Sequence, residues 1–461
     1  MSQMTELMID DDRPYWNMSI EPKLNTPEMR EIQEYKLKKQ IKRLREGAPY
    51  YSQLFKKCSV HEDKIKSFEE LRHAIPVFTK KDWRELVQRY EGNIIEAVDQ
   101  LIPVNAYTDL YLMSTTTGTT GEPEPYAMTK KDVWDVYGEV LARYGWRCGV
   151  RQSDRVLLAF GLSMFIAGVP TIAGFWKIGC LVLPVGAEAG TERILRMANY
   201  FRPTVLIATP SLITYLIDRC PDILGKNVGE LGIRIIMCGG EPGAGMPQVR
   251  QKIESAYGAR LFDLGAALGV SCWHEEYQGM HQVGDDFQIF ELVHPDTKEP
   301  LPFKNGQQGE AVYTMIDGGG WGWVRHSMGD IMEIYTEPCP CGLSGFRYKV
   351  VGRTDDMLKV KGVMIYPSMI RSVVESFVPR VTTQFRIVLD EPPPRVAPPL
   401  KLKVERGEGF PPEKLEELAT EIGDSMSAKI KIRPKIIWME AGELERSTYK
   451  GKTFEKTYEK K

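Results

Sequence analysis

The chain has 461 residues, enough for two or more domains, and its 43% hydrophobic and 26% charged residues are typical of a globular protein. The formal net charge of −2 disfavours nucleic acid and anionic membranes as partners and favours a small substrate. The sequence does not open on a basic stretch followed by an apolar core, and no apolar run reaches the roughly 18 residues that span a bilayer, so we expect a cytoplasmic protein.

Residues 26–46 are charged and periodic, and they contain no proline after Pro27. This pattern predicts a surface helix capped by Asn25 or Thr26, which would begin a helical N-terminal layer.

A run of hydroxyl and glycine residues at 114–123 follows the apolar residues 110–113, which are typical of the end of a strand. Gly118 and Gly121 permit turns with φ > 0 that aim backbone amides inward, and a strand leading into such a loop is a standard phosphate-binding geometry. The hydroxyl groups that could donate to phosphate oxygens are those of Ser114, Thr115, Thr116, Thr117, Thr119 and Thr120. A flexible linker is the alternative. A Walker P-loop is excluded because Glu122 follows Gly121.

Apolar runs alternate with helical segments between about residues 130 and 270, which predicts an α/β layer with a largely parallel sheet. The runs are 156–160, 180–184, 205–209 and 233–237. The loops that follow strand ends, where open α/β sheets bind ligands, are 184–186, 209–211 and 239–242.

Short strand-like runs with turns follow from about residue 285, at 287–292 and 310–314, and predict a β-rich subdomain. Residues 353–461 predict a compact α+β unit of ordinary small-domain size. Its expected helices are 368–377 and 412–426, its expected strands include 383–389 and 435–439, and a proline-rich loop is expected at 391–399.

Five separated segments, taken in order, resemble the adenylate-forming enzymes, and within them the phenylacetate–coenzyme A ligase group. The segments are 114–123, 208–211, 239–242, 328–330 and 352–362. The resemblance covers roughly residues 70–455. It implies a large N-terminal α/β domain over residues 1–352, with mostly parallel sheets and a β-rich subdomain. A small mobile α+β C-terminal domain would follow over 353–461, with a hinge near 353–356.

The resemblance also implies site residues for an enzyme that uses ATP, Mg²⁺ and coenzyme A. Gly239, Gly240, Glu241 and Pro242 match the adenine-side loop, and Asp263, also a predicted cofactor residue, matches the aspartate that begins the family's Asp-x-Tyr-Gly-x-Ser/Thr-Glu segment. Asp330 matches the ribose-binding aspartate, Arg353 would bind ribose or phosphate, and Asp355 matches the hinge. Lys361 and Gly362 end the same motif, and Gly362 would face the crevice during thioester formation. A capping aspartate and a surface arginine are the alternatives for Asp330 and Arg353.

The segment 445–452 resembles the family's terminal segment, whose lysine supports the adenylation transition state by neutralising charge as pyrophosphate leaves. Lys450 is the favoured equivalent because it lies four residues after Arg446, and Lys452 is the second choice because it follows a glycine. A solvated basic tail is the alternative.

Three segments depart from the family pattern. Glu122 stands where lysine is common, and His326 stands where tyrosine is usual. In the third segment, Leu264 and Leu268 stand where the family has a tyrosine and a magnesium-binding glutamate. Leucine cannot coordinate magnesium, so Glu275 or Glu276 substitutes, or phosphates and water hold the metal, or adenylation is impaired.

Two cysteines lie one residue apart in a tight turn, at Cys339 and Cys341, and His274 and His281 precede them. The phenylacetate ligase group has a similar Cys/His pair followed by Cys-x-Cys, and here His274 would replace the cysteine. The expected site is a closed, structural Cys₂His₂ zinc site, with Cys272 as a competing ligand and free thiols as the alternative. The other cysteines are expected to be reduced and mostly buried, as in a cytosolic protein.

The acyl pocket is expected along the aromatic and glycine-rich stretches 160–170 and 321–323. Phe165, Gly168, Gly265 and Ala266 are the predicted substrate contacts, although aromatic stretches more often form core.

These features favour an AMP-forming ligase that joins a carboxylic acid, an aromatic one by preference, to coenzyme A. One rival adenylates the acid and passes it to an amine or a carrier thiol. Another is a degenerate relative that binds nucleotide without turnover. The oligomeric state is left open, with a homodimer as one alternative.

Overall fold

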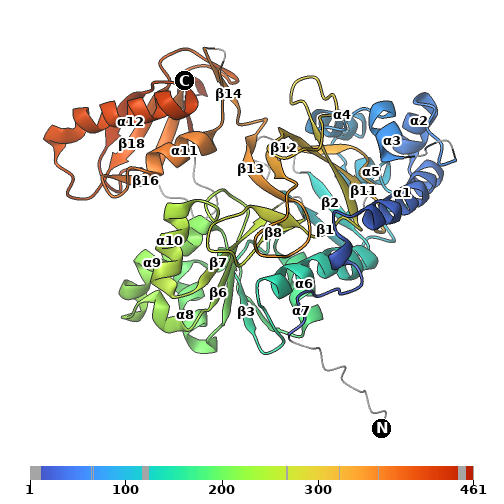
Figure 1. Cartoon of the computed structure of the whole chain (residues 1–461), viewed down its shortest axis with the longest axis horizontal. Helices are drawn as coiled ribbons and strands as arrows, with labels where there is room; N and C mark the ends of the chain where they lie inside the picture. The colour runs from blue at the N-terminus through green and yellow to red at the C-terminus, as the bar shows by residue number, and fades with distance from the viewer. Residues whose placement is uncertain are drawn as a thin grey trace, which may run out of the picture.

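The structure is a computed structural model that describes residues 12–63, 65, 67–116, 124–265, 268–320, 322–361, 363–444 and 453–459. Figure 1 shows a large region built on one long sheet, with a smaller C-terminal unit beside helix α10 and strand β13. No helix in these described ranges is long and apolar enough to cross a membrane.

Short helices form the N-terminal layer of the large region. They are α1 (Pro27–Gly47), α2 (Pro49–Lys57), α3 (Phe68–Ala74), α4 (Lys80–Arg89) and α5 (Ile94–Asp99). The predicted first helix is confirmed, since the Thr26 side chain accepts a hydrogen bond from the Met29 amide and caps α1. Leu37, Ile41 and Leu44 recur on one face of α1 and are buried in the core of this layer.

A two-stranded antiparallel ribbon follows, formed by β1 (Leu112–Thr115) and β2 (Pro125–Met128). Its pairing runs from Leu112 opposite Met128 to Thr115 opposite Pro125. The predicted loop residues Thr117, Gly118, Thr119, Thr120 and Gly121 lie outside the described residues.

The parallel half of the long sheet has the order β4-β3-β5-β6-β7. Its strands are β3 (Arg155–Leu158), β4 (Leu181–Pro184), β5 (Val205–Ala208), β6 (Ile235–Cys238) and β7 (Arg260–Gly265). The helices η2 (Asp132–Tyr137) and α6 (Gly138–Arg147) precede β3. The helices between the strands include α7 (Val169–Ile178), α8 (Thr191–Phe201), α9 (Pro210–Leu224) and α10 (Pro247–Tyr257). The predicted α/β class is confirmed. The apolar runs form these strands because the central ones are buried on both faces.

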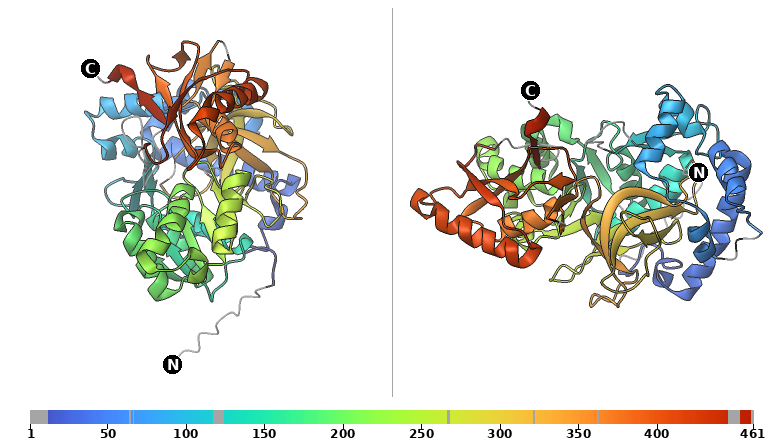
Figure 2. Two further views of the ribbon diagram at one scale, coloured as in Figure 1. Left: turned by 90° about the vertical axis from the view of Figure 1, so that its left-hand side faces the viewer. Right: turned by 90° about the horizontal axis from the view of Figure 1, so that it is seen from above.

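The antiparallel half continues the same sheet in the order β7-β8-β9-β13-β12-β11-β10. Its further strands are β8 (Gly269–Ser271), β9 (Met280–Gln282), β10 (Gln288–Val293), β11 (Gln308–Met315), β12 (His326–Tyr335) and β13 (Arg347–Arg353). Figure 2 shows these strands curling beside the N-terminal helices. The predicted β-rich part is therefore continuous with the parallel sheet, because β8 turns back antiparallel along the end of β7.

The C-terminal unit has its own apolar core. Its elements are β14 (Leu358–Val360), β15 (Val363–Ile365), α11 (Pro367–Glu375), β16 (Val381–Leu389), β17 (Arg395–Val396), β18 (Lys401–Arg406), α12 (Leu415–Ile430), β19 (Lys435–Met439) and β20 (Phe454–Lys456). The expected proline-rich loop contains the short strand β17, which pairs with β14. The unit meets the large region where the Tyr366 ring packs on Gly352 and the Ser368 hydroxyl donates to the Val351 carbonyl.

Candidate active site and metal centre

The carboxyl end of β6 opens the candidate site. Gly239 and Gly240 follow β6 directly, and Gly240 has φ +85°, a conformation that glycine adopts without strain. A Cβ atom on Gly240 would lie 3.7 Å from Thr209 Cγ2 and 3.8 Å from Phe165 Cζ. The structure therefore brings the predicted adenine-side loop next to the predicted substrate residue Phe165.

The β1–β2 ribbon reaches the same place. The Thr115 amide donates to the Met164 carbonyl at 2.6 Å, and the Ile166 amide donates to the Thr115 carbonyl at 3.1 Å. These bonds place Phe165 beside Thr115, so one predicted phosphate residue and one predicted acyl residue are neighbours. Ser114 is buried in the ribbon.

Glu241 fixes the loop to the start of α9. Its Oε1 accepts a hydrogen bond from the Ser211 amide at 2.8 Å, and the Thr209 side chain caps the same helix. Pro242 is exposed, and no contact with the other predicted site residues is observed for it among the described residues.

Gly168 and Gly265 are required by close packing. A Cβ atom on Gly168 would lie 2.2 Å from the Gly161 carbonyl oxygen, and one on Gly265 would lie 2.3 Å from the Tyr348 hydroxyl. The Gly265 carbonyl accepts a hydrogen bond from Tyr144 at 3.3 Å. Ala266 lies outside the described residues.

Asp263 lies in β7, two residues before Gly265. Its Oδ2 accepts a 2.7 Å hydrogen bond from the Tyr277 hydroxyl. Burial raises the pKa of Asp263 to about 6, and the hydrogen bond from Tyr277 opposes this rise only partly. The structure therefore gives Asp263 a protein partner.

A chain of charges joins β12 to the segment after β13. Arg353 Nη1 lies 2.5 Å from Asp330 Oδ1, and Arg353 Nε donates to Asp355 Oδ1 at 3.0 Å. Asp355 Oδ2 in turn accepts from Lys80 Nζ at 2.8 Å, although Lys80 belongs to α4 in the N-terminal layer. The structure thus brings together three residues that sequence reasoning assigned to the nucleotide and the hinge, and adds Lys80, which it missed.

The remaining predicted cofactor residues either lie in the C-terminal unit or fall outside the described part of the chain. Lys361 is exposed in the turn between β14 and β15 and has φ +49°. Gly362, Lys450 and Lys452 lie outside the described residues. Their roles stay predictions.

Leu268 packs inward against Gly284, and its carbonyl accepts from the Val283 amide. Glu275 and Glu276 do not replace it near the nucleotide. They lie in the turn that Arg260, the first residue of β7, holds through the Trp273 and His274 carbonyls, at the opposite end of the strand from Gly265. Of the alternatives considered for magnesium, this placement removes substitution by either glutamate.

Cys272, His281, Cys339 and Cys341 form the cluster with metal-binding potential, and their ligand atoms all lie within 4.8 Å of one another. This corrects the expected set, because Cys272 takes the place assigned to His274. Cys272 follows β8 immediately, whereas His274 lies two residues further into the turn. There its Nδ1 is 3.2 Å from the Glu276 amide nitrogen.

The cluster fits tetrahedral zinc. Cys272 Sγ lies 3.9 Å from Cys339 Sγ, and Cys341 Sγ lies 3.4 Å from His281 Nε2. These separations match the edges of a tetrahedron with Zn–S arms of the usual length, about 3.8 Å. The hydrogen bond with Cys341 lowers the pKa of the Cys272 thiol, although burial opposes this effect. The cluster can thus supply a thiolate, the form that binds metal.

His281 is oriented for this role. Its Nδ1 donates to the Ser344 carbonyl at 3.0 Å, which leaves Nε2 directed at the cysteines. Such a partner behind a metal-binding histidine fixes the tautomer and the ring orientation.

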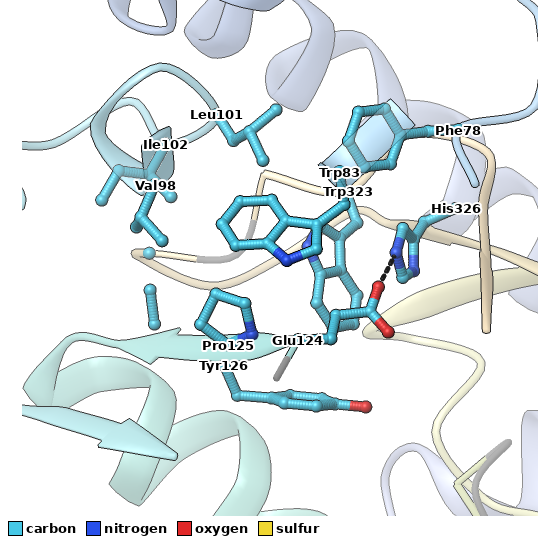
Figure 3. A pocket seen from close by; sticks show the side chains of 12 residues that line it. Phe78, Trp83, Val98, Leu101, Ile102, Glu124, Pro125, Tyr126, Trp323 and His326 are labelled. Carbon is cyan, nitrogen blue, oxygen red and sulfur yellow. Dashed lines mark ion pairs between the residues drawn. The ribbon is translucent and has the colours of Figure 1, made fainter. Parts of the chain in front are cut away.

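A buried ion pair that the sequence did not reveal lies beside the ribbon. His326 Nε2 and Glu124 Oε1 are 2.5 Å apart, and Figure 3 shows the two side chains facing each other beside Trp323. Glu124 follows the predicted phosphate loop and His326 begins β12. No local pattern could have paired them, since they are about 200 residues apart.

Known proteins resemble the chain over most of its length. The family described as AMP-binding enzyme C-terminal domain matches residues 362–456. The phenylacetate-coenzyme A ligase of Thermus thermophilus is 30% identical over 409 residues, which cover 85% of this chain and 85% of that protein. The enzyme of the same name from Aromatoleum evansii is 26% identical over 432 residues, covering 92% of this chain and 93% of that protein. A solved structure of 2-hydroxyisobutyryl-CoA ligase in the postadenylation state has a TM-score of 0.85 at 24% identity, covering 97% of this chain and 93% of that one, and so shares the fold.

Proposed function

Because the chain belongs to the phenylacetate–coenzyme A ligase group of adenylate-forming enzymes, we propose that it is an AMP-forming acid–thiol ligase. It would activate a carboxylic acid with ATP and transfer the acyl group to coenzyme A. The observation that carries this proposal is the 30% identity to a phenylacetate-coenzyme A ligase over 85% of the chain. The names of these relatives, and the rings of Phe160 and Phe165 beside the adenine-side loop, favour an aromatic acid.

The reaction has two steps. The acid's carboxylate attacks the α-phosphorus of ATP, which forms the acyl adenylate and breaks the bond to pyrophosphate. The thiolate of coenzyme A then attacks the acyl carbon, and AMP leaves with the electrons of the broken acyl–oxygen bond.

The described residues fit the first step. Asp330, kept in place by Arg353, would accept hydrogen bonds from the ribose hydroxyls, and Ser114, Thr115 and Thr116 would donate to phosphate. Phe165 would meet the acyl group next to Thr115. Lys450, or failing it Lys452, would neutralise charge on the departing pyrophosphate.

Two metals would serve different tasks. Magnesium would be held by phosphate oxygens and water, since leucine stands at position 268 and Glu275 and Glu276 lie at the other end of β7. Zinc would be held by Cys272, His281, Cys339 and Cys341, and four protein ligands make that site structural. A cytoplasmic location stays a prediction, and the oligomeric state, with a homodimer as one alternative, stays open.

The test is incubation of the purified protein with ATP, magnesium, coenzyme A and a panel of aromatic and aliphatic acids, with AMP and acyl-CoA followed by mass spectrometry. Acyl-CoA from one acid class is the expected result. Adenylate without thioester would indicate an amine or carrier acceptor, and neither product would indicate a non-catalytic relative. Lys450→Ala and Lys452→Ala should separate the two lysines, with Lys456→Ala, an exposed lysine of β20, as control.

A further inference from the structure

The ion pair of Glu124 and His326 links two elements of the candidate nucleotide site. Glu124 immediately precedes β2 of the ribbon, and its carbonyl accepts a hydrogen bond from the Thr116 amide at 3.2 Å, closing the base of the ribbon. His326 is the first residue of β12, the strand that also carries Asp330. The pair therefore ties the proposed phosphate ribbon to the proposed ribose-binding strand.

The pair is buried and isolated. Its side chains are 6% and 1% exposed, and among the described residues neither the carboxylate oxygens of Glu124 nor the ring nitrogens of His326 make a hydrogen bond to any third group. The His326 ring stacks on Trp323 with centroids 4.2 Å apart and 22° between planes (Figure 3). Each side chain is thus the direct polar partner of the other.

The cavity beside the pair is too small for an organic ligand. It measures about 20 Å³ and is lined by Trp83, Tyr126 and Trp323 as well as the pair, so it has room for about one water molecule. The Glu124 and His326 side chains therefore bind each other, and the cavity offers no room for a larger ligand between them.

The carboxylate remains charged in this place. Burial by itself would raise the pKa of Glu124, but the charge of His326, helped by Lys80 and Arg353, outweighs burial and lowers it. A buried ion pair seldom adds stability over well-packed apolar side chains, although removing one partner is costly. The best-attested use of such a pair is to fix the register of the elements that carry it.

We propose that Glu124 and His326 are positioning residues that hold the β1–β2 ribbon in register with Asp330, so that one nucleotide reaches both. A second contact runs in parallel, since the Tyr126 hydroxyl lies 3.3 Å from Met328 Sδ. The inference rests on the proposed function, because it needs ATP to bind with its phosphates at the ribbon and its ribose at Asp330.

The experiment compares ATP with adenosine, which has the ribose but lacks the phosphates. His326→Phe keeps the stacked ring and leaves Glu124 unpaired, whereas the double variant Glu124→Met with His326→Phe replaces both charges by apolar groups. Calorimetry measures the Kd of ATP and of adenosine, and thermal unfolding measures stability. The double variant should recover the melting temperature lost in His326→Phe, yet bind ATP at least about tenfold more weakly than wild type while its adenosine Kd changes less than about twofold.

A matched control removes another buried ion pair, one of whose members, Arg325, immediately precedes β12. Arg325 and Glu291 are 2.8 Å apart and 4% and 2% exposed, but they connect β10 to the N-terminal layer and do not touch the ribbon. Arg325→Met with Glu291→Met should not discriminate between ATP and adenosine. Recovery of ATP affinity together with stability in the Glu124/His326 double variant, or an equal loss for both ligands, would overturn the inference. Wild-type protein that binds no ATP would instead overturn the proposed function.

Discussion

Arg353 is the residue on which the charges of the candidate site converge. It contacts the carboxylates of Asp330 and Asp355 and donates to the Met328 carbonyl at 2.8 Å. Burial would lower the pKa of this guanidinium, but the two carboxylates outweigh burial and raise it. The orientation of the Asp330 carboxylate is therefore fixed by a permanently charged partner.

Asp330→Asn should weaken the use of ATP. The amide keeps the size of the side chain but removes the charged acceptor, and a hydrogen bond to a charged group contributes about 1.5–3 kcal/mol. We expect kcat/KM for ATP to fall roughly 10- to 100-fold in an adenylation assay. Asp222→Asn, an exposed aspartate of α9 paired with Arg219, is the control. An unchanged kcat/KM would show that Asp330 does not bind nucleotide.

Asp285 predicts a pH dependence of stability. Burial, together with the nearby charge of Asp286, raises its pKa to about 7, against the hydrogen bond from the Asn25 amide. Between about pH 4 and pH 7 the native state therefore binds the proton more tightly than the unfolded chain, so this group's contribution to stability falls as pH rises.

Asp285→Asn should remove that loss while keeping an acceptor for the Asn25 amide. The free energy of unfolding of the variant minus that of wild type should be about 2–3 kcal/mol larger at pH 8 than at pH 5, as measured by urea denaturation, which means that the variant is relatively more stable at pH 8. Asp222→Asn should show no such difference. The same advantage at both pH values would mean that Asp285 titrates normally.

The hairpin that carries Cys339 and Cys341 contacts the N-terminal segment through Ser344, in addition to the contacts of that segment with α6. The Ser344 carbonyl accepts a hydrogen bond from His281 Nδ1. The Ser344 amide donates to the Tyr15 hydroxyl at 3.0 Å, and the Ser344 hydroxyl donates to the Glu21 carbonyl at 2.5 Å. Glu21 also forms a buried ion pair with Arg147 at 2.6 Å. The proposed metal ligands and residues 15–21 therefore share one connecting residue.

Removal of zinc should loosen this segment. Without a metal, the hairpin loses the bonds that fix Cys339, Cys341 and His281, and Ser344 loses its fixed position. Hydrogen exchange measured by mass spectrometry should show faster uptake in residues 12–24 after treatment with a chelator, with β18 in the C-terminal unit as the internal control. Ser344→Ala should loosen the same segment with the metal still bound. Unchanged exchange after verified zinc loss would contradict the link.

At the scale of the whole molecule, the C-terminal unit meets the large region along β13 and α11, and Lys80 extends that contact from the N-terminal layer. Lys80 and Asp355 are 30% and 24% exposed, and their ion pair spans 275 positions of sequence. Rotation of the C-terminal unit about residues 353–356, the predicted hinge, would have to break or carry this pair.

Lys80→Ala should make the predicted hinge easier to open. A partly exposed ion pair contributes at most about 1 kcal/mol, so opening should increase no more than about fivefold. The rate of hydrogen exchange in residues 363–370, where the Tyr366 ring packs on Gly352, followed by mass spectrometry, measures it. Lys81→Ala is the matched control, since this neighbour is 84% exposed and pairs only along its own helix with Glu85. Equal rates in both variants would remove Lys80 from the hinge.

The sequence by itself determined the elements and the fold class. Buried runs such as 156–158 form parallel strands because they are apolar on both faces, and α1 begins after Thr26 because a capping side chain and Pro27 act locally. The five motifs, in their order, were sufficient to indicate the family, since each motif is a short continuous segment of sequence.

Only the tertiary structure decided which distant groups meet. Cys272, and not His274, joins the cluster with metal-binding potential because the chain turns directly after β8. Neither Glu275 nor Glu276 lies near the proposed nucleotide loops, because that turn lies at the opposite end of β7 from Gly265. In the sequence, His326 is only a departure from the family pattern. The structure adds its partner, Glu124, at 2.5 Å. Such pairs depend on strand order and register over hundreds of residues, and no local propensity encodes them.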